Sequence, residues 1–136
     1  MYSQAEAHLT ILDNCAGRSL RRAYLVLLLG AERAGLHCAA REKVCELQIR
    51  DDEGRQFFTV ALTPDALLFS LRRPALDDSP VLAVQAMDRF LGRVRGAPGS
   101  SEVHIRITGE QDAEDLVDWL FPSGNFSLGY AARRSA

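Results

Sequence analysis

The fold is decided by residues 43–73, which read KVCELQIRDDEGRQFFTVALTPDALLFSLRR. Three apolar segments in this stretch are separated by two short polar ones. In the first, Cys45, Leu47 and Ile49 alternate with polar residues, and this period of two predicts a strand with one buried and one exposed face. With residues 57–62 and 67–72 as the next two strands, the stretch predicts an antiparallel three-stranded meander.

The two polar segments carry turn residues. Asp51-Asp52-Glu53-Gly54 ends in a glycine, which tolerates positive φ. In Thr63-Pro64-Asp65-Ala66, the proline fixes φ for the first central position of a turn. We therefore predict two tight turns and direct pairing of consecutive strands.

The middle strand is apolar on both faces. This pattern is typical of a strand covered on both sides, or of one whose second face meets a partner. Phe57, Thr59 and Ala61 are therefore candidate partner-binding residues, as are Arg72 and Arg73 at the end of the third strand.

Residues 3–36 are predicted to be helical, as one kinked helix or as two, because Gly17 interrupts the helical spacing. Gly35 is a plausible stop. The apolar stripe between Leu20 and Ala34 is too wide for a helix covered on one side only. It predicts a helix that is buried over most of its circumference or contributes to an oligomer interface.

After the meander, residues 74–80 are predicted to form a loop that leads into a helix from Pro80 to Arg95. The buried side of that helix is expected to carry five apolar residues: Val81, Val84, either Met87 or Ala86, Phe90 and Leu91. A Gly/Pro/Ser loop precedes a fourth strand over residues 102–108, and a last helix follows and ends at residues 122–124.

These elements predict an α+β fold in the order α(α)-β-β-β-α-β-α. An antiparallel sheet of about four strands, the meander plus one, packs with three to four helices. Residues 1–124 are expected to form a single domain, with residues 125–136 as a loose C-terminal tail.

The composition is that of a soluble globular protein. The 136 residues carry a net charge of −2, with 47% hydrophobic and 25% charged residues. The three cysteines lack the even count and spacing of a disulfide framework. The N-terminus lacks the basic region of a signal peptide, and residues 23–29 are too short an apolar run to span a membrane. We expect a cytoplasmic protein with reduced thiols and no membrane association.

No group of residues indicates catalysis or a cofactor. His104 and Arg106 share the exposed face of the fourth strand and can contact an anionic ligand or a partner. His37, Cys38 and Cys45 are too few for a structural zinc site, which needs four ligands. We predict no enzyme, no metal and no cofactor.

Arginines occur in local groups, which favours an accessory nucleic-acid-associated module as an alternative function. Neighbouring acidic residues cancel most of this charge, so nucleic acid is the less favoured partner.

The order of elements resembles that of small acidic bacterial secretion chaperones, which bind an unfolded segment of a client, and is similar to that of several small bacterial immunity proteins. The resemblance is one of layout. A single predicted strand before the last helix and a long leading helical region depart from the chaperone layout. The sequence therefore predicts a non-catalytic bacterial protein-binding module of immunity, antitoxin or secretion-chaperone type, which acts on a protein partner, as a homodimer, or both.

Overall fold

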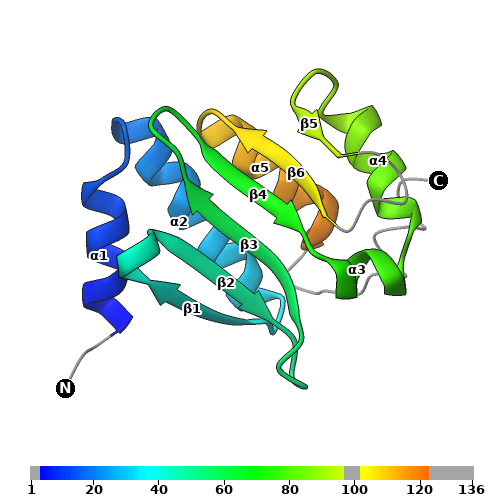
Figure 1. Cartoon of the computed structure of the whole chain (residues 1–136). Helices are drawn as coiled ribbons and strands as arrows, with labels where there is room; N and C mark the ends of the chain where they lie inside the picture. The colour runs from blue at the N-terminus through cyan, green and yellow to red at the C-terminus, as the bar shows by residue number, and fades with distance from the viewer. Residues whose placement is uncertain (1–3, 97–101, 123–136) are drawn as a thin grey trace.

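The structure, a computed structural model, describes residues 4–96 and 102–122. Its described residues form an α+β fold in which a six-stranded antiparallel sheet has the order β1-β2-β3-β4-β6-β5 (Figure 1). The elements in chain order are α1 (Gln4–Asp13), α2 (Arg18–Arg33), β1 (His37–Arg41), the 3-10 turn η1 (Glu42–Val44), β2 (Glu46–Arg50), β3 (Gln56–Leu62), β4 (Leu67–Leu71), α3 (Arg73–Asp78), α4 (Val81–Arg89), β5 (Val94–Arg95), β6 (Val103–Ile107) and α5 (Glu110–Leu120).

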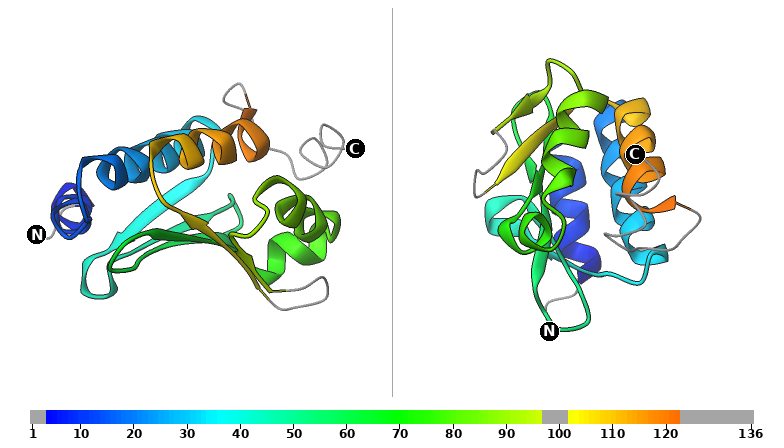
Figure 2. Two further views of the ribbon diagram at one scale, coloured as in Figure 1. Left: turned by 90° about the horizontal axis from the view of Figure 1, so that it is seen from above. Right: turned by 90° about the vertical axis from the view of Figure 1, so that its right-hand side faces the viewer.

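The helices cover the sheet on one face. Figure 2 shows α1, α2 and α5 on the same side of the strands, whereas α3 and α4 lie at one end of the molecule. No helix of the described residues covers the opposite face, which is turned toward the viewer in Figure 1. None of these helices combines the length and the apolar character that a membrane-spanning helix requires.

The core lies between the helices and the inner face of the sheet. Pairing in register places Leu47, Val60, Phe69 and Ile105 side by side across β2, β3, β4 and β6. All four are at most 1% exposed. Trp119 of α5 is fully buried as well, and its indole N–H donates to Gln85 of α4, with 3.3 Å between the heavy atoms. The Trp119 contact joins α4 to the end of the helix layer.

The predicted meander is present as β2, β3 and β4, and both turns form where the sequence places them. Gly54 adopts a φ of 81°, and the Asp51 side chain accepts hydrogen bonds from the amides of Glu53 and Arg55. In the second turn, the Thr63 amide donates to the Ala66 carbonyl. Local residue chemistry is therefore enough to define these hairpins.

The prediction of about four strands was wrong, because two further strands flank the four that were expected. β1 pairs with β2 at one edge, and β5 pairs with β6 at the other. β5 has only two residues, and the sequence assigned them to the end of a helix. That helix, α4, ends at Arg89, and Gly92 adopts a φ of 82° that turns the chain back toward the sheet.

The structure settles one open prediction and corrects two others. The leading segment, expected as one kinked helix or as two, forms two helices, with Gly17 at a φ of 99° between them. Residues 73–78, within the predicted loop, form the short helix α3. Cys45 lies outside the first strand of the meander, because it adopts a left-handed conformation at the end of η1. The predicted tail, residues 125–136, lies outside the described residues.

The wide apolar stripe between Leu20 and Ala34 lies on α2. Burial explains most of it, because α2 packs against the sheet and against α5. Gly30 permits a close approach of the two helices: a β-carbon there would lie 2.8 Å from Cγ2 of Val117. A real β-carbon essentially never lies so close to a neighbouring atom, and the branched valine has little rotamer freedom in a helix.

We predict that Gly30→Ala lowers the free energy of unfolding despite the better helix propensity of alanine, which is worth about 1 kcal/mol. In a Val117→Ala background, the same substitution should instead raise stability by up to about 1 kcal/mol. Urea denaturation of the four proteins in this double-mutant cycle measures both signs. A stabilising effect in both backgrounds would show that α2 and α5 are not in tight contact at Gly30.

Candidate partner-binding site

A row of polar side chains crosses the face of the sheet that no described helix covers. Pairing in register aligns Gln48, Thr59, Ser70 and His104 across β2, β3, β4 and β6. Gln48, Thr59 and Ser70 are nevertheless buried, with exposures of 8%, 4% and 4%. Arg50 donates to Oε1 of Gln48 over 2.6 Å, so the row is held together within the protein.

The second face of β3 is therefore not an open apolar surface. Thr59 lies in the buried polar row, and Ala61 is partly buried beside it. Phe57 lies opposite an irregularity in the β2–β3 ladder, where Ile49 pairs with Phe58 and Arg50 pairs with Gln56. Its ring packs on Phe58, and the chain neighbour Arg55 lies 4.9 Å from its centroid. Residues Phe57 and Thr59 are each only 4% exposed.

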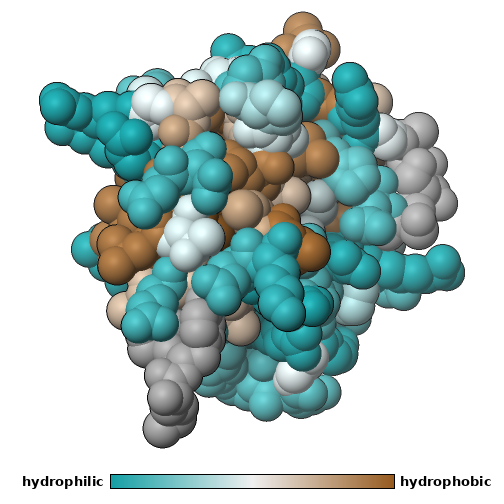
Figure 3. Space-filling view, turned by 60° about the vertical axis from the view of Figure 1, so that its left-hand side comes forward, coloured by the Kyte–Doolittle hydropathy of each residue, from teal (hydrophilic) through white to brown (hydrophobic). Residues whose placement is uncertain are grey.

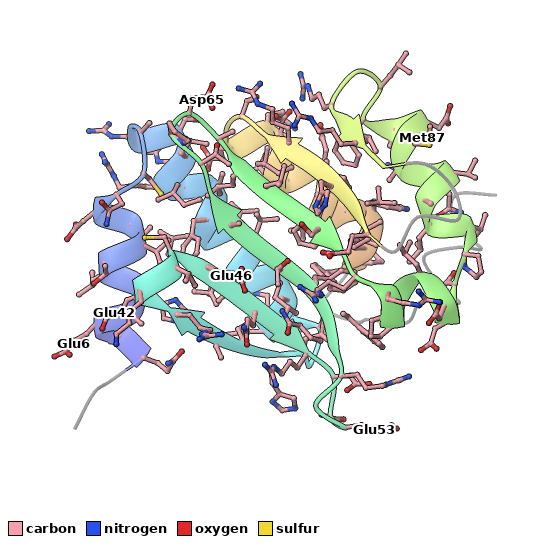
Figure 4. The ribbon with its side chains drawn as sticks, in the orientation of Figure 1. Glu6, Glu42, Glu46, Glu53, Asp65 and Met87 are labelled. Atoms are coloured by element: carbon pink, nitrogen blue, oxygen red, sulfur yellow. The ribbon has the colours of Figure 1, made fainter. Side chains whose placement is uncertain are left out.

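A hollow of about 340 Å³ lies beside this row, at the end of the sheet nearest β5. It brings together the predicted pair His104 and Arg106 of β6, which face away from the core. The other lining residues come from the β3–β4 turn, from β4 and from the segment that contains β5: Thr63, Asp65, Ala66, Leu68, Gly92, Arg93, Val94 and Arg95. Figure 4 labels Asp65 at the rim, in the turn between β3 and β4.

Two of the three arginines in the hollow are paired with carboxylates. Arg106 donates to Asp65 over 2.7 Å, and both side chains are about half or more exposed. Arg93 pairs with Asp112 in the first turn of α5. Among the described residues, Arg95 has no hydrogen-bond or ion-pair partner. The hollow therefore carries more positive than negative charge.

The carboxylate of Asp112 is held firmly. It accepts hydrogen bonds from the amide and the hydroxyl of Thr108, at 2.8 and 2.6 Å. Burial alone raises the pKa of Asp112, but the Thr108 hydrogen bonds and the charge of Arg93 outweigh it, so the pKa lies below its ordinary value. Asp112 thus stays ionised and fixes the position of Arg93.

His104 is held on its other side by Ser70, with 2.6 Å between Oγ and Nδ1. Ser70 lies within β4, whose backbone pairs with β3 on one side and β6 on the other. The hydrogen bond orients the imidazole of His104 beside the hollow.

The remaining predicted candidates lie elsewhere. Arg72 follows β4 and is 3.8 Å from Glu102, and Arg73 begins α3 and pairs with Asp77 over 3.5 Å. Farther away, Arg22 of α2 lies 3.7 Å from Glu110. Each of these three arginines therefore has an acidic neighbour.

His8 of α1 and Cys38 of β1 are both partly buried. His8 Nδ1 lies 2.8 Å from the Tyr24 hydroxyl, and burial lowers the pKa of His8. Burial raises the pKa of Cys38 to about 12, which disfavours the thiolate that metal binding or nucleophilic attack would require. Within the described ranges, no three metal-ligating side chains gather.

α4 presents a feature that the sequence analysis assigned to the core. The buried residues of α4 are Leu82, Ala83, Gln85 and Ala86, and Phe90, directly after the helix, is buried as well. Val81, Val84, Met87 and Leu91 are exposed by 44%, 53%, 39% and 86%. The predicted buried side was right for Ala86 and Phe90 and wrong for Val81, Val84 and Leu91, because the helix is apolar on two sides and the spacing alone does not say which one meets the core. Figure 4 labels Met87 on the outer part of the molecule.

The two edges of the sheet differ. At β1, the side chain of Gln4 accepts a hydrogen bond from the Ala40 amide over 2.8 Å and lies 3.5 Å from the Ala40 carbonyl. At the opposite edge, β5 pairs only with β6 among the described strands. α4 lies close to this unpaired edge (Figure 1).

A second apolar area lies at the opposite end of the molecule. Figure 3 shows apolar side chains gathered among hydrophilic ones on the α1 side. Leu9 of α1 and Val44 of η1, each 57% exposed, are the large apolar residues that these two elements expose.

Comparison of the chain with profiles of known protein families, with curated proteins and with solved structures finds no match. A function must therefore be argued from the geometry of these surfaces.

We predict that Asp112→Asn lowers the free energy of unfolding at neutral pH by about 1–3 kcal/mol, because it removes charge-assisted hydrogen bonds. The folded pKa of Asp112 is lowered, so its contribution is present above the unfolded pKa of about 3.9 and is lost as the pH falls through the folded pKa. Chemical denaturation at several pH values should show the two proteins converging in acid.

The matched control is Asp77→Asn, at an exposed ion pair, which should change stability by less than about 0.5 kcal/mol. An equal effect of both substitutions would contradict the role assigned to Asp112.

Proposed function

We propose that this chain is a non-catalytic protein-binding module that works as a homodimer, with α4 and β5 as the contact between its two copies. The observation that carries the proposal is an exposed apolar stripe beside a sheet edge that is unpaired among the described strands: Val81, Val84 and Met87 on the outer side of α4, with Leu91 in the turn that follows the helix. We refer to these four residues as the α4 stripe.

The α4 stripe exposes more adjoining apolar residues than the surface of a soluble monomer usually does. Single exposed apolar residues are ordinary, but three on the outer side of a short helix, with a fourth in the turn directly after it, form a patch of the kind that marks protein contacts. α4 also lies at an end of the molecule, so that a second copy can approach it without meeting the other helices (Figure 2).

A second copy is the occupant that the edge of the sheet favours. An unpaired edge strand presents backbone donors and acceptors that match another strand, and antiparallel pairing of an edge with itself generates a two-fold axis. Because β5 has only two residues, such pairing supplies few hydrogen bonds, and most of the buried area must come from α4. The other edge is less suitable, because Gln4 occupies the backbone groups of Ala40.

The element order supports a module of secretion-chaperone type within the broader class. The sequence predicted only one strand before the last helix, which departs from the layout of these chaperones. The structure has two strands, β5 and β6, in that position. Immunity and antitoxin proteins remain in the same proposed class, because they too act by binding a protein partner.

Size-exclusion chromatography with light scattering tests the dimer. The unaltered chain is expected to have twice its 15.0 kDa mass. Val84→Glu should raise the dimer dissociation constant by about a hundredfold or more, because a carboxylate buried without a partner costs several kcal/mol. Circular dichroism should show that the variant remains folded, since Val84 does not contribute to the core.

The matched control is Leu9→Glu, at an equally exposed apolar residue of α1 at the other end of the molecule. It should leave the mass at that of a dimer. A monomer at 100 µM for the unaltered chain, or dissociation by Leu9→Glu and not by Val84→Glu, would overturn the proposed contact.

A further inference from the structure

The hollow beside β5 has an unusual pattern of charge. In the β5–β6 ladder, Arg95 lies directly opposite His104, and the Arg106 amide donates to the carbonyl of Arg93 over 2.9 Å. Basic residues therefore face basic residues across the two strands. Side chains of like charge placed directly opposite each other destabilise a sheet, and within the protein the carboxylates of Asp112 and Asp65 offset this for Arg93 and Arg106.

We infer that this hollow binds the carboxylate of an acidic side chain in an extended segment of a partner protein. The inference rests on the proposed protein-binding function, but not on the proposed dimer. It assigns His104 and Arg106, together with Arg93 and Arg95, to one recognition site for a client of defined chemistry.

The internal carboxylates leave room for a ligand anion. Asp65, the partner of Arg106, is 72% exposed, so its ion pair is largely solvated and exchanges readily with another carboxylate. Arg93 is 47% exposed although it pairs with Asp112, so part of its guanidinium faces outward. Arg95 has no partner among the described residues and is free to form a two-pronged contact with a carboxylate.

The apolar part of the lining favours a peptide over a phosphate or a nucleic acid. Leu68 is partly exposed and lies directly opposite Arg106 in the β4–β6 ladder, and the buried Ala66 lies near it in the lining. An acidic residue beside an aliphatic one matches this combination of charge and apolar surface. A nucleic-acid site would be expected to add aromatic side chains for stacking, and the described lining has none.

The test uses the full chain and short capped peptides in which glutamate and leucine are interspersed with serine, labelled for fluorescence anisotropy. Binding is expected to be saturable and to weaken as salt is raised. The matched peptide with glutamine in place of glutamate should bind at least tenfold more weakly. Arg95→Gln and Arg106→Gln should each weaken binding of the acidic peptide by about tenfold, the effect of losing one charge-assisted contact.

Arg73→Gln is the matched control, because Arg73 is exposed and lies at the start of α3, away from the hollow. It should leave the affinity unchanged. Equal binding of the two peptides, or equal effects of all three substitutions, would overturn the inference. Tight binding of inorganic phosphate that displaces the acidic peptide would also overturn it, because the site would then serve a phosphate.

The peptide-binding test and the test of the dimer can fail independently of each other. Arg106→Gln, in β6 and outside the proposed dimer contact, should retain the mass of the unaltered protein, and Val84→Glu should retain the peptide affinity.

Discussion

The pairing of β4 with β6 is the contact on which the rest of the structure depends. It joins residues 67–71 to residues 103–107, so that the C-terminal part of the chain is added to a meander that local turns already define. Leu67, Phe69 and Leu71 bring Ile107, Ile105 and Val103 into the core on the same ladder. α5 can pack on α2 only because β6 ends beside it, and β5 gains a place in the sheet only because β6 offers its other side.

The same pairing separates a buried face of the sheet from the face that lines the hollow. Along β6, Val103, Ile105 and Ile107 are fully buried, and the alternating positions His104 and Arg106 face away from the core. A shift of one residue in register would place charged groups among the aromatic residues of the core, where an unpaired charge costs several kcal/mol. Burial on one face therefore fixes, to within a residue, which side chains line the hollow on the other.

Much of this architecture could be predicted from the sequence where one residue type determines a local conformation. The two turns, the alternation in β2 and β6 and the stop at Gly35 are of this kind. β1 was missed because Cys38, Ala39 and Ala40 lack the branched side chains that mark a strand, and its pairing with β2 decides its conformation. Of the four basic residues that line the hollow, the sequence identified only His104 and Arg106 as candidates, because it placed Arg93 and Arg95 at the end of a helix.

The sequence could not predict which side of α4 faces the core, and the reason is a different one. A helix with apolar residues on two sides satisfies the core with either side, and the choice depends on the volume that must be filled beside Trp119. Phe90, whose ring centroid lies 6.0 Å from that of Trp119, fills it, and this fixes the α4 stripe on the outside. Exposed apolar surface is unfavourable in water, so a second apolar side on α4 is most simply explained by a contact with another chain. The polar, internally bonded face of β2–β4 offers no such surface. In the proposed function, the apolar contact of α4 and the charged hollow therefore lie side by side at the end of the molecule formed by α4 and β5.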